Sequence, residues 1–570
     1  MALVAVLFAA ALHGEAAPVR AAEPPNGCPA DDGGIALPPG FCATVFADNI
    51  GHARHLVVAA NGVVYVNTWS GGYYGNRPPP PGGFLVALKD TRGVGRADVI
   101  RRFGDGVAQG SAGGTGIAIY NGALYVEQND RILRYRLAEP SITPTGRPDV
   151  IVSGMPLGGD HPMHPFVIDA SGNIFVDVGS ATNSCQAANR MPLSPGINPC
   201  TELATRGGIW RFDANRTGQK FSPKERYATG IGNGEGMSFD GAGRLFVTQH
   251  GRDQLAENWP DLYAPDIGLE LPAEELVELQ HNADYGWPFC YFDGAQRRLV
   301  LAPEFGGDGG QKLGVCAQKQ GPVAFFPAHW APDDLLIYNA GPFPAPYHGG
   351  AFIAFHGSWN RAPAPQAGYN VAFEPLADGN VSGDYIVYAD GFAGAEKAPG
   401  RAQFRPTGLA IGPDGALFIS DDVQGRIWRI TYQGGADLPA VLVSARLAAP
   451  TGAPHDARPP VASLPLAPGV TREQLIQGDH VFHGEESGGN CSGCHSSDGK
   501  GSIVGADLTA GTWLWGDGSL PAITATITTG VPAAKKAFGA MPPLGGAKLS
   551  QAEVSAVAAY VWALGHRTVK

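Results

Sequence analysis

Charged residues are scarce in this sequence: Lys, Arg, Asp and Glu make up only 16% of the 570 residues, against about a quarter in an average soluble protein. The balance is acidic, with a formal net charge of −12, so we expect no basic surface for nucleic acid. No 18 apolar residues follow one another, so we expect no membrane-spanning helix. A hydrophobic content of 44% still suffices for a packed core and excludes a wholly disordered chain.

Glycine and proline are abundant instead, with 81 and 48 copies, and they do not follow the three-residue period of collagen. So many turn-forming residues are typical of a chain with many short strands and argue against a helical bundle.

A short apolar strand, a glycine-containing turn and a second strand recur along the chain. The copies are residues 55–68, 116–128, 165–179, 236–249 and 408–421, with a looser copy at 349–359. Six such units over roughly 400 residues predict an all-β six-bladed propeller, with a large β-sandwich or two stacked barrels as the alternative. Longer stretches at 180–206 and 251–348 interrupt the repeats, and we expect them to build the binding face.

The chain divides into four predicted segments. Residues 1–22 are typical of a secretory signal peptide, and residues 28–435 would form the propeller. Residues 436–469 are an Ala/Pro-rich linker, and residues 470–570 would form a small all-α domain. We therefore expect an exported protein, either periplasmic or secreted.

Six cysteines form close pairs in the predicted propeller. They are Cys28/Cys42, Cys185/Cys200 and Cys290/Cys316. Six cysteines permit 15 connectivities, of which sequential pairing closes the shortest loops. Disulfides fit an exported protein, and buried thiols are the alternative. A zinc site is disfavoured because no Cys-x-x-Cys occurs among the six.

The run Cys491-Ser492-Gly493-Cys494-His495 is the attachment motif of a c-type haem. In such a site the thiols of Cys491 and Cys494 bond the porphyrin covalently, and His495 ligates the iron. Met541 is the methionine that follows this motif, and it is the predicted sixth ligand. His480 and His483 are less favoured alternatives.

Helices are predicted on both sides of the haem motif, at residues 471–484 and 549–565. Ser550 caps the second helix, with Glu553 three residues later. The order of helix, Cys-x-x-Cys-His, Met-Pro-Pro loop and final helix resembles a class I cytochrome c domain over residues 471–565. This resemblance implies a haem c that accepts electrons, since thioether ligation favours reduced iron.

Several runs in the predicted propeller resemble the quinoprotein glucose/sorbosone dehydrogenase family, whose propellers hold pyrroloquinoline quinone (PQQ) and calcium. The runs are GGDHPMHPFVIDASGNIFVDVGS (158–180), YATGIGNGEGMSFD (227–240), TQHGRDQL (248–255), NADYGWP (282–288), HGSWNR (356–361), FRPTGLAIGPDGALFISDD (404–422) and GRIWRI (425–430). The resemblance implies oxidation of a sugar, sugar aldehyde or polyol, with electrons passing from PQQ to the haem. A cytochrome, copper protein or respiratory chain would then accept them.

The same resemblance implies roles for individual residues. His161 matches the base that removes the hydroxyl proton, and His164 is a second candidate. The matches to cofactor contacts are Asn233, Gln249, Arg252, Arg361 and Arg405. Calcium would be bound by backbone carbonyls, which correspond to Gly251 and Arg252.

Two departures from the family pattern concern the cofactor. The family usually has Arg directly before the Asn that corresponds to Asn233, and this chain has Gly232 there. The contact is therefore lost or supplied from elsewhere, for which Arg252 is a candidate. The usual lysine near residues 356–361 is also not evident.

Two other functions remain open from the sequence. A lactonase-type hydrolase would hold calcium on the propeller axis through Asp, Glu and Asn side chains, but it would give the cytochrome no role. A propeller that only docks a redox partner or a polysaccharide would use haem as its sole cofactor, and Gly232 favours that reading.

Overall fold

The structure is a computed structural model, and the described residues are 29, 31–70, 80–104, 113–339, 341–361, 364–434, 459–484, 486–487, 491–495, 498–501, 505–531, 535 and 541–567. The predicted signal peptide, Cys28 and most of the predicted linker lie outside these residues.

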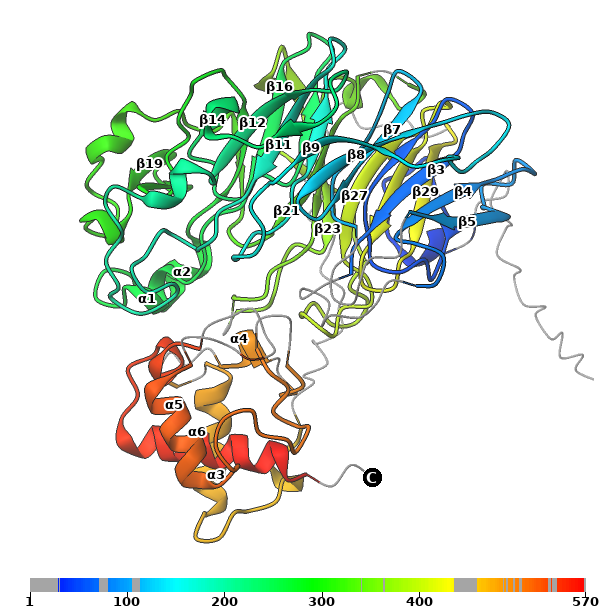
Figure 1. Cartoon of the computed structure of the whole chain (residues 1–570). Helices are drawn as coiled ribbons and strands as arrows, with labels where there is room; N and C mark the ends of the chain where they lie inside the picture. The colour runs from blue at the N-terminus through cyan, green and yellow to red at the C-terminus, as the bar shows by residue number, and fades with distance from the viewer. Residues whose placement is uncertain are drawn as a thin grey trace, which may run out of the picture.

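Six sheets of four or five strands form the N-terminal domain (Figure 1). The first contains β2 (Ala53–Val58), β3 (Val64–Thr68), β4 (Leu85–Lys89) and β5 (Val99–Phe103). The second contains β6 (Ile117–Tyr120), β7 (Ala123–Gln128), β8 (Arg131–Arg136), β9 (Asp149–Ser153) and β13 (Gln219–Lys220). The third contains β10 (Phe166–Ile168), β11 (Asn173–Val178), β12 (Gly208–Asp213) and β14 (Arg226–Thr229).

The other three sheets follow in chain order. The fourth contains β15 (Met237–Phe239), β16 (Leu245–Gln249), β17 (Glu274–Glu278) and β20 (Ala324–Phe326). The fifth contains β21 (Pro332–Ile337), β22 (Ala351–Phe355), β23 (Asn370–Glu374) and β26 (Ile386–Ala389). The sixth contains β27 (Pro406–Ile411), β28 (Leu417–Asp421), β29 (Ile427–Tyr432) and β1 (Phe41–Ala47).

The sheets are the blades of a six-bladed propeller, as the repeats predict. The first strand of each blade contacts its counterparts in the two neighbouring blades, and the ring closes where β2 meets β27. The chain's first strand completes the last blade, because β1 pairs antiparallel with β29, with Phe41 opposite Tyr432. This pairing joins the two ends of the domain within one sheet and thereby holds the ring closed.

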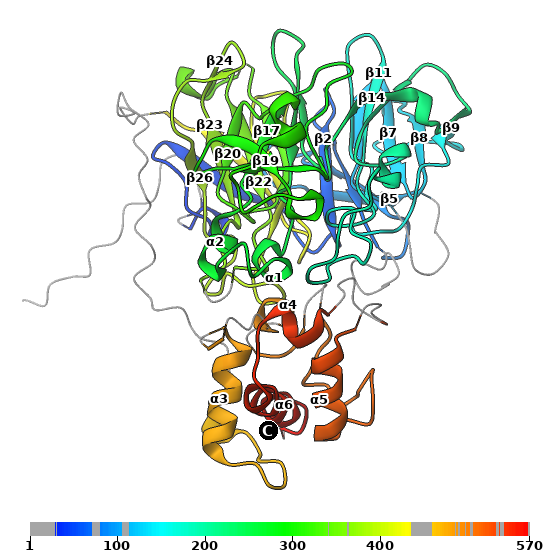
Figure 2. The ribbon, with the colours of Figure 1, turned by 90° about the vertical axis from the view of Figure 1, so that its left-hand side faces the viewer.

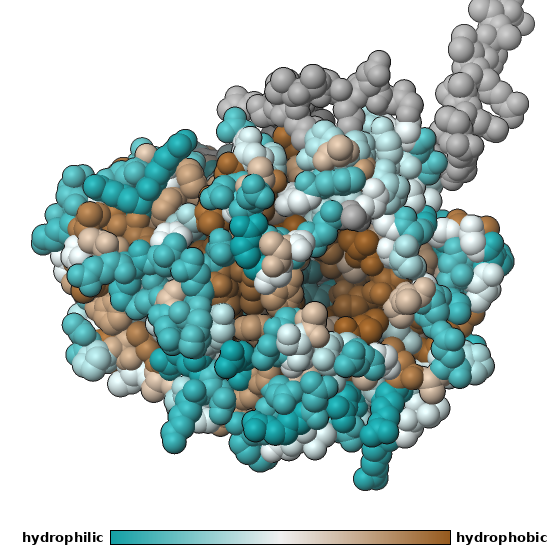
Figure 3. Space-filling view, turned by 90° about the horizontal axis from the view of Figure 1, so that it is seen from above, coloured by the Kyte–Doolittle hydropathy of each residue, from teal (hydrophilic) through white to brown (hydrophobic). Residues whose placement is uncertain are grey.

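The strand sequences follow from how the blades pack. β3 and β16 are buried at every position, because each blade lies between two others and both of its faces are covered. In both strands the first three residues are aliphatic or aromatic and the last two are polar, although all five are buried. Figure 3 shows the face of the propeller that points away from the helical domain, where hydrophobic side chains surround a central hollow inside a hydrophilic rim.

The fifth blade begins earlier in the chain than the sequence repeats predict. The repeat at 349–359 corresponds to β22, and the inner strand β21 lies in the stretch 251–348, which was predicted to be an insertion. Two adjacent aspartates, Asp333 and Asp334, interrupt the apolar pattern of β21, although both are buried. The stretch also supplies β17 and β20, so only part of it is inserted.

The inserted parts hold short elements. They are α1 (Leu255–Asn258), α2 (Pro265–Glu270), and the hairpin of β18 (Cys290–Asp293) and β19 (Arg298–Leu301). A second small hairpin consists of β24 (Leu376–Ala377) and β25 (Asn380–Val381). Two predicted disulfides are confirmed, Cys185–Cys200 and Cys290–Cys316, and Cys42 is also disulfide-bonded.

Single turns of 3-10 helix connect many of these elements. They are η2 (Asp32–Gly34), η4 (Thr201–Ala204), η5 (Pro223–Glu225), η6 (Pro303–Phe305), η7 (Gly314–Gln318), η8 (Ala345–Tyr347), η9 (Val461–Ser463) and η10 (Pro543–Gly546).

The C-terminal domain is helical, as predicted. It contains α3 (Arg472–Phe482), α4 (Cys491–His495), α5 (Leu520–Thr529) and α6 (Gln551–Gly565). Ser550 and Glu553 form the predicted capping box at the start of α6. Helices α3 and α6 cross closely at Gly478, where a Cβ would lie 2.1 Å from the Ala556 oxygen. Only glycine permits this approach.

Residues 459–469, predicted to be part of the linker, pack on the helical domain: Leu464 is buried in the same core as Leu475 of α3 and Val557 of α6. The domain lies against the propeller face that carries α1, with α4 nearest to it (Figures 1 and 2). Among the described parts of the chain, no helix combines the length and hydropathy needed to cross a membrane.

Candidate functional site

A polar pocket lies at the propeller axis, on the side that carries α1. Four of the residues predicted for the base, the quinone and the calcium line it: His161, Asn233, Gly251 and Arg405. They come from different blades and connecting loops, so the ring of blades brings together residues that are up to 244 positions apart. Histidines and carboxylates make up much of the remaining wall.

His161 lies at the edge of the pocket, and its Nδ1 atom is 2.9 Å from Ser180 Oγ. Burial lowers the pKa of this imidazole, and Arg190 acts in the same direction, whereas the nearby Asp160 opposes the shift. Its neutral form is therefore favoured, as a general base requires.

His164, the second candidate base, is buried away from the pocket. Its Nδ1 lies 3.2 Å from Glu127 Oε1 and its Nε2 lies 3.0 Å from the Pro156 oxygen. Both ring nitrogens are thus bonded within the protein, and His164 does not line the pocket.

Arg405 presents a guanidinium group at the pocket. Its Nε donates to the His356 oxygen at 2.9 Å, and its Nη2 donates to the Gly357 oxygen at 2.7 Å. The guanidinium also lies over the ring of Tyr369, 5.3 Å from the centroid. These contacts hold the cation in one orientation, with Nη1 making no hydrogen bond to any described residue.

Three residues predicted to contact the cofactor are turned elsewhere. The side chain of Gln249 accepts from Gly232 N and donates to Glu275, both at 3.0 Å, beneath the pocket. Arg252 pairs with the buried carboxylate of Glu304 at 2.5 Å. Arg361 donates to backbone oxygens outside the pocket, including that of Leu269 at 2.7 Å. Neighbouring acceptors, which the sequence motifs do not reveal, determine these orientations.

The position of Gly232 explains why the family arginine is missing. A Cβ at Gly232 would lie 2.7 Å from Cδ1 of Trp287. The indole fills the space that a longer side chain would need, and its Nε1 donates to the Asn183 oxygen at 3.0 Å. Arg252 does not replace the lost cation, since its guanidinium is paired with Glu304.

Arg190 is a pocket cation that the sequence analysis missed. It belongs to the loop closed by the Cys185–Cys200 disulfide and lines the pocket. Its Nε lies 2.8 Å from Asp160 and its Nη2 lies 3.0 Å from Asp253. The only signal in the sequence was that residues 180–206 form an insertion expected at the binding face.

The floor of the pocket contains buried charges on the propeller axis. Arg54 forms ion pairs with Glu235 at 2.6 Å, Asp333 at 2.9 Å and Asp422 at 3.1 Å. Glu235, His250 and Asp333 could present ligand atoms to a metal within 4.8 Å of one another. The guanidinium of Arg54 already compensates the negative charges of Glu235 and Asp333. Pairing with a cation is how buried carboxylates are normally stabilised.

Asn360 places an unsatisfied acceptor beside the pocket. Its Nδ2 donates to Asp253 Oδ1 at 3.0 Å and lies 3.2 Å from His329 Nδ1. Its Oδ1 is buried and has no hydrogen-bond partner. A buried polar atom of this kind is normally satisfied by an ordered water or by a ligand.

The helical domain contains a second, mainly apolar cavity, which the thiols of Cys491 and Cys494 line together with His495 and Met541. The Nδ1 of His495 lies 2.8 Å from the Ala506 oxygen. A carbonyl can only accept, so this nitrogen carries the proton and Nε2 is left to bind a metal.

Met541 enters the cavity from a short two-stranded contact with Val531, in which the two backbones exchange hydrogen bonds of 2.7 and 2.9 Å. His480 and His483, the alternative ligands, do not line the cavity: His480 lies 3.4 Å from Glu486 and His483 lies 3.1 Å from Asp479.

The two cavities adjoin, and Gln254 and Cys494 line both of them. Glu257 of α1 also contributes to the wall of the apolar cavity. Ion pairs join the domains around this contact. They are Lys548 with Asp261, and Arg401 with Asp498 at 3.3 Å.

Comparison with protein families gives two matches. The family described as TrAA12-like matches residues 35–433. The family described as cytochrome C oxidase, cbb3-type, subunit III matches residues 477–561.

Individual relatives agree with this division. A pyrroloquinoline quinone-dependent pyranose dehydrogenase of Coprinopsis cinerea is 26% identical over 234 residues, which cover 36% of this chain and 31% of that protein. The cbb3-type cytochrome c oxidase subunit CcoP of Rhodobacter capsulatus is 42% identical over 83 residues, which cover 13% of this chain and 26% of that protein. The chain thus spans about a quarter to a half of the length of the curated relatives it matches.

The fold has solved counterparts. The iodide structure of the carbohydrate-active enzyme family AA12 from Trichoderma reesei superposes with a TM-score of 0.56 at 18% identity. The match covers 70% of this chain and 98% of that one.

Proposed function

The chain belongs to the TrAA12-like family over residues 35–433, and on this premise we propose that it is a PQQ-dependent sugar dehydrogenase that passes electrons to its own haem c. The observation that carries the proposal is the adjoining pair of cavities. One holds a candidate base and two arginines, the other holds the complete haem motif, and Gln254 and Cys494 line both. The match to the pyranose dehydrogenase of C. cinerea supports sugar as the substrate class.

The pocket fits a quinone that carries carboxylates. Arg405 provides a guanidinium group whose Nη1 makes no hydrogen bond to any described residue, and guanidinium groups recognise carboxylates through their N–H donors. Arg190 lines the same pocket, where it is paired with Asp160 and Asp253. Asn233 lines the same wall, and the buried Oδ1 of Asn360 has no partner within the protein. When bound, PQQ would supply an electron-poor carbonyl that takes up two electrons as a hydride.

His161 would act as the general base. Oxidation of a CH–OH group to C=O releases a hydride and a proton, and Nε2 of His161 would hold that proton. The imidazole is suited to this step because burial lowers its pKa. The pocket walls would orient the hydroxyl and exclude bulk water.

Calcium would lie beside the backbone of Gly251, which lines the pocket. The Gly251 N–H donates to Glu274 Oε2 at 2.8 Å, which holds this turn in place. Oxygen ligands suit a hard cation, so the carbonyls of Gly251 and Arg252 remain the proposed ligands.

The apolar cavity fits a haem c. Cys491 and Cys494 would bond the porphyrin, and His495 and Met541 would ligate the iron. The hydrogen bond from His495 to Ala506 would hold the imidazole for that purpose. Fusion of the donor and the acceptor in one chain raises their effective concentration.

We also propose that the protein is exported. The two disulfides described above support an oxidising compartment. A soluble cytochrome, a copper protein or a respiratory chain would then oxidise the haem.

The hydrolase alternative is less well supported by the geometry. It needs an axial metal held by side chains, and at the axis Arg54 already pairs with Glu235 and Asp333. A docking propeller would not need a base, an unsatisfied amide and two arginines in one pocket.

The test is reconstitution of the full haem-loaded protein with PQQ and calcium. Stopped-flow spectra should show haem reduction after addition of an aldose, a polyol or a sugar aldehyde, and none before PQQ is added. Failure of the whole panel to reduce either the haem or an added dye, with PQQ stoichiometrically bound, would overturn the proposal. Hydrolysis of a lactone without any acceptor would favour the alternative.

A further inference from the structure

The hydrogen bonds around Ser180 determine which nitrogen of His161 carries the proton. Ser180 is fully buried, and its Oγ lies 2.9 Å from His161 Nδ1 and 2.8 Å from the Thr182 carbonyl oxygen. A hydroxyl has one proton to donate, and a carbonyl oxygen can only accept. The Ser180 proton therefore goes to Thr182, and Ser180 Oγ accepts from Nδ1–H of His161.

The opposite arrangement leaves an acceptor without a donor. If Ser180 donated to His161, the Thr182 oxygen would face an oxygen lone pair at 2.8 Å. No other hydrogen bond to that carbonyl exists among the described residues. A partly buried acceptor without a donor costs free energy, so the first arrangement is favoured.

We infer that Ser180 is a positioning residue that holds His161 in its Nδ1–H tautomer and thereby makes Nε2 the basic nitrogen. A neutral imidazole carries one N–H, so fixing that hydrogen on Nδ1 leaves the lone pair on Nε2. Nε2 forms no hydrogen bond with any described residue and is available to a substrate hydroxyl. The catalytic meaning of this tautomer rests on the proposed function, and the tautomer itself does not.

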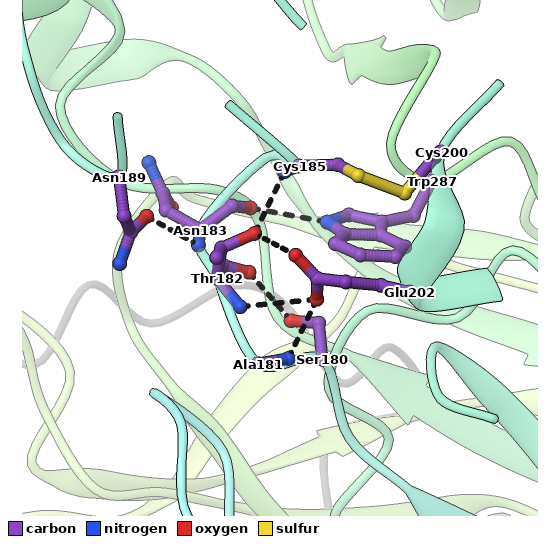
Figure 4. The surroundings of a disulfide bond; sticks show 9 residues. All are labelled: Ser180, Ala181, Thr182, Asn183, Cys185, Asn189, Cys200, Glu202 and Trp287. Carbon is purple, nitrogen blue, oxygen red and sulfur yellow. Dashed lines mark hydrogen bonds between the residues drawn. A yellow bond between two sulfur atoms is a disulfide. The ribbon is translucent and has the colours of Figure 1, made fainter. Parts of the chain in front are cut away.

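The loop around Ser180 is held rigidly enough to serve this purpose (Figure 4). Glu202 accepts from Ala181 N at 2.8 Å and from Thr182 N at 3.2 Å. Thr182 Oγ1 donates to the same carboxylate and accepts from Cys185 N at 2.9 Å. Glu202 follows Cys200 closely, so the Cys185–Cys200 disulfide ties both sides of this network together.

Ser180 orients the base without adding a charge to it. A carboxylate at this position would stabilise the imidazolium and raise the pKa of His161. The charged groups that act on His161 are Asp160, Asp253 and Arg190, and they counteract one another. A neutral partner leaves the imidazole in its unprotonated form, in which it can accept a proton.

The tautomer can be measured in the full chain without PQQ. Two-bond ¹H–¹⁵N spectra of haem-loaded, ¹⁵N-histidine-labelled protein distinguish the two ring nitrogens, and the difference from His161→Asn identifies the His161 signals. The wild type should show a protonated Nδ1 and an unprotonated Nε2. Ser180→Ala should shift His161 towards protonated Nε2, and Ser180→Thr, which retains the hydroxyl, should restore the wild-type pattern.

Kinetics supply the second readout. Ser180→Ala should lower kcat by about tenfold with little change in KM, because only one tautomer can act as the base. Ser184→Ala is the matched control: Ser184 is equally buried in the same loop, but its Oγ contacts Glu304, 3.2 Å away. It should leave the His161 signals and kcat close to wild type.

Two results would overturn the inference. One is a wild-type His161 protonated on Nε2, and the other is an unchanged tautomer in Ser180→Ala. If Ser180→Ala does not fold, the spectra of the wild type and of Ser180→Thr still show which ring nitrogen of His161 is protonated. Full sugar turnover by His161→Asn would instead refute the proposed base and leave the tautomer assignment standing.

Discussion

The polar pocket of the propeller and the apolar cavity around Cys491, Cys494, His495 and Met541 adjoin. The pocket and this second cavity, named the haem cavity below, are built from opposite kinds of side chain. The pocket contains largely buried charged groups such as Arg190 and Asp160, each compensated by a partner. The haem cavity has walls of apolar residues such as Phe482, Ile523 and Val557. Buried ions must be paired, so the charged residues of the pocket are held by partners from other parts of the chain, such as Asp160 and Asp253 for Arg190. The haem cavity would need only to exclude water around the proposed haem, which covalent and metal bonds would hold.

This difference predicts which measurable property a substitution in each site should change. Changes in the pocket should alter cofactor affinity and proton transfer, because its residues act through charge and hydrogen bonds. Changes in the haem cavity should alter the spectrum and the potential, because its residues act on the iron.

The largest effect should come from His161→Asn. Loss of the base should lower sugar-driven haem reduction by about 10²- to 10⁴-fold, while the absorption spectrum of the haem stays as in the wild type. Stopped-flow reduction and static spectra measure the two effects. Comparable turnover by this variant would break the separation between the two sites.

Arg405→Ala should weaken PQQ binding by about tenfold to a hundredfold, since a charge-assisted hydrogen bond in a buried site is lost. Arg361→Ala is the comparison, because Arg361 donates to the Leu269 oxygen outside the pocket and should change the Kd much less. Titration of the PQQ-free full-length protein with PQQ measures the Kd of both variants. A larger effect from Arg361 would contradict the placement of these two arginines.

The pH dependence of sugar turnover should follow the protonation of His161 in the propeller pocket. Burial lowers the pKa of His161 from its ordinary value of 6.5, so the imidazole should stay neutral down to a pH below that value. As the pH falls further, turnover should drop by about tenfold per unit because the base becomes protonated. The kcat of dye-linked oxidation against pH measures this, and an acidic limb centred above 6.5 would contradict it.

Met541→Ala should spare dye-linked sugar oxidation and lower transfer through the haem by a factor of about ten or less, as the loss of a thioether ligand lowers the potential. The haem spectrum and a redox titration report the change at the iron. Collapse of dye reduction in this variant would show that the two sites do not act separately.

The smallest effect should come from Lys548→Glu at the contact between the domains. Lys548 and its partner Asp261 are both about 70% exposed, and exposed ion pairs contribute little. We expect internal electron transfer to slow by about twofold or less at physiological salt, with recovery in the reversed pair Lys548→Glu/Asp261→Lys. An equal change in the dye-linked rate would place the effect in the propeller instead.

Much of the fold could be predicted from the sequence, because its signals are local. The repeats predict the paired strands of five blades, and the capping box at Ser550 predicts the start of α6. The inner strand β21 was missed because Asp333 and Asp334 interrupt its apolar pattern. Their burial depends on partners in other blades, such as Arg54 for Asp333.

The candidate site could be predicted only in part. His161, Asn233, Gly251 and Arg405 line the pocket, whereas Gln249, Arg252 and Arg361 do not bring their side chains to it. Family motifs mark the strand ends, where residues can reach the axis. They do not reveal that Glu304 pairs with Arg252 or that Trp287 fills the space beside Gly232.

By itself, the sequence determined the repeated strands, the helical tail and the haem motif, because each depends on neighbours within a few residues. The tertiary structure alone decided which arginines reach the pocket, where Arg54 meets its carboxylates and which nitrogen of His161 is basic. Those outcomes depend on hydrogen-bond partners separated by tens to hundreds of residues, which the folded loops and the ring of blades bring together.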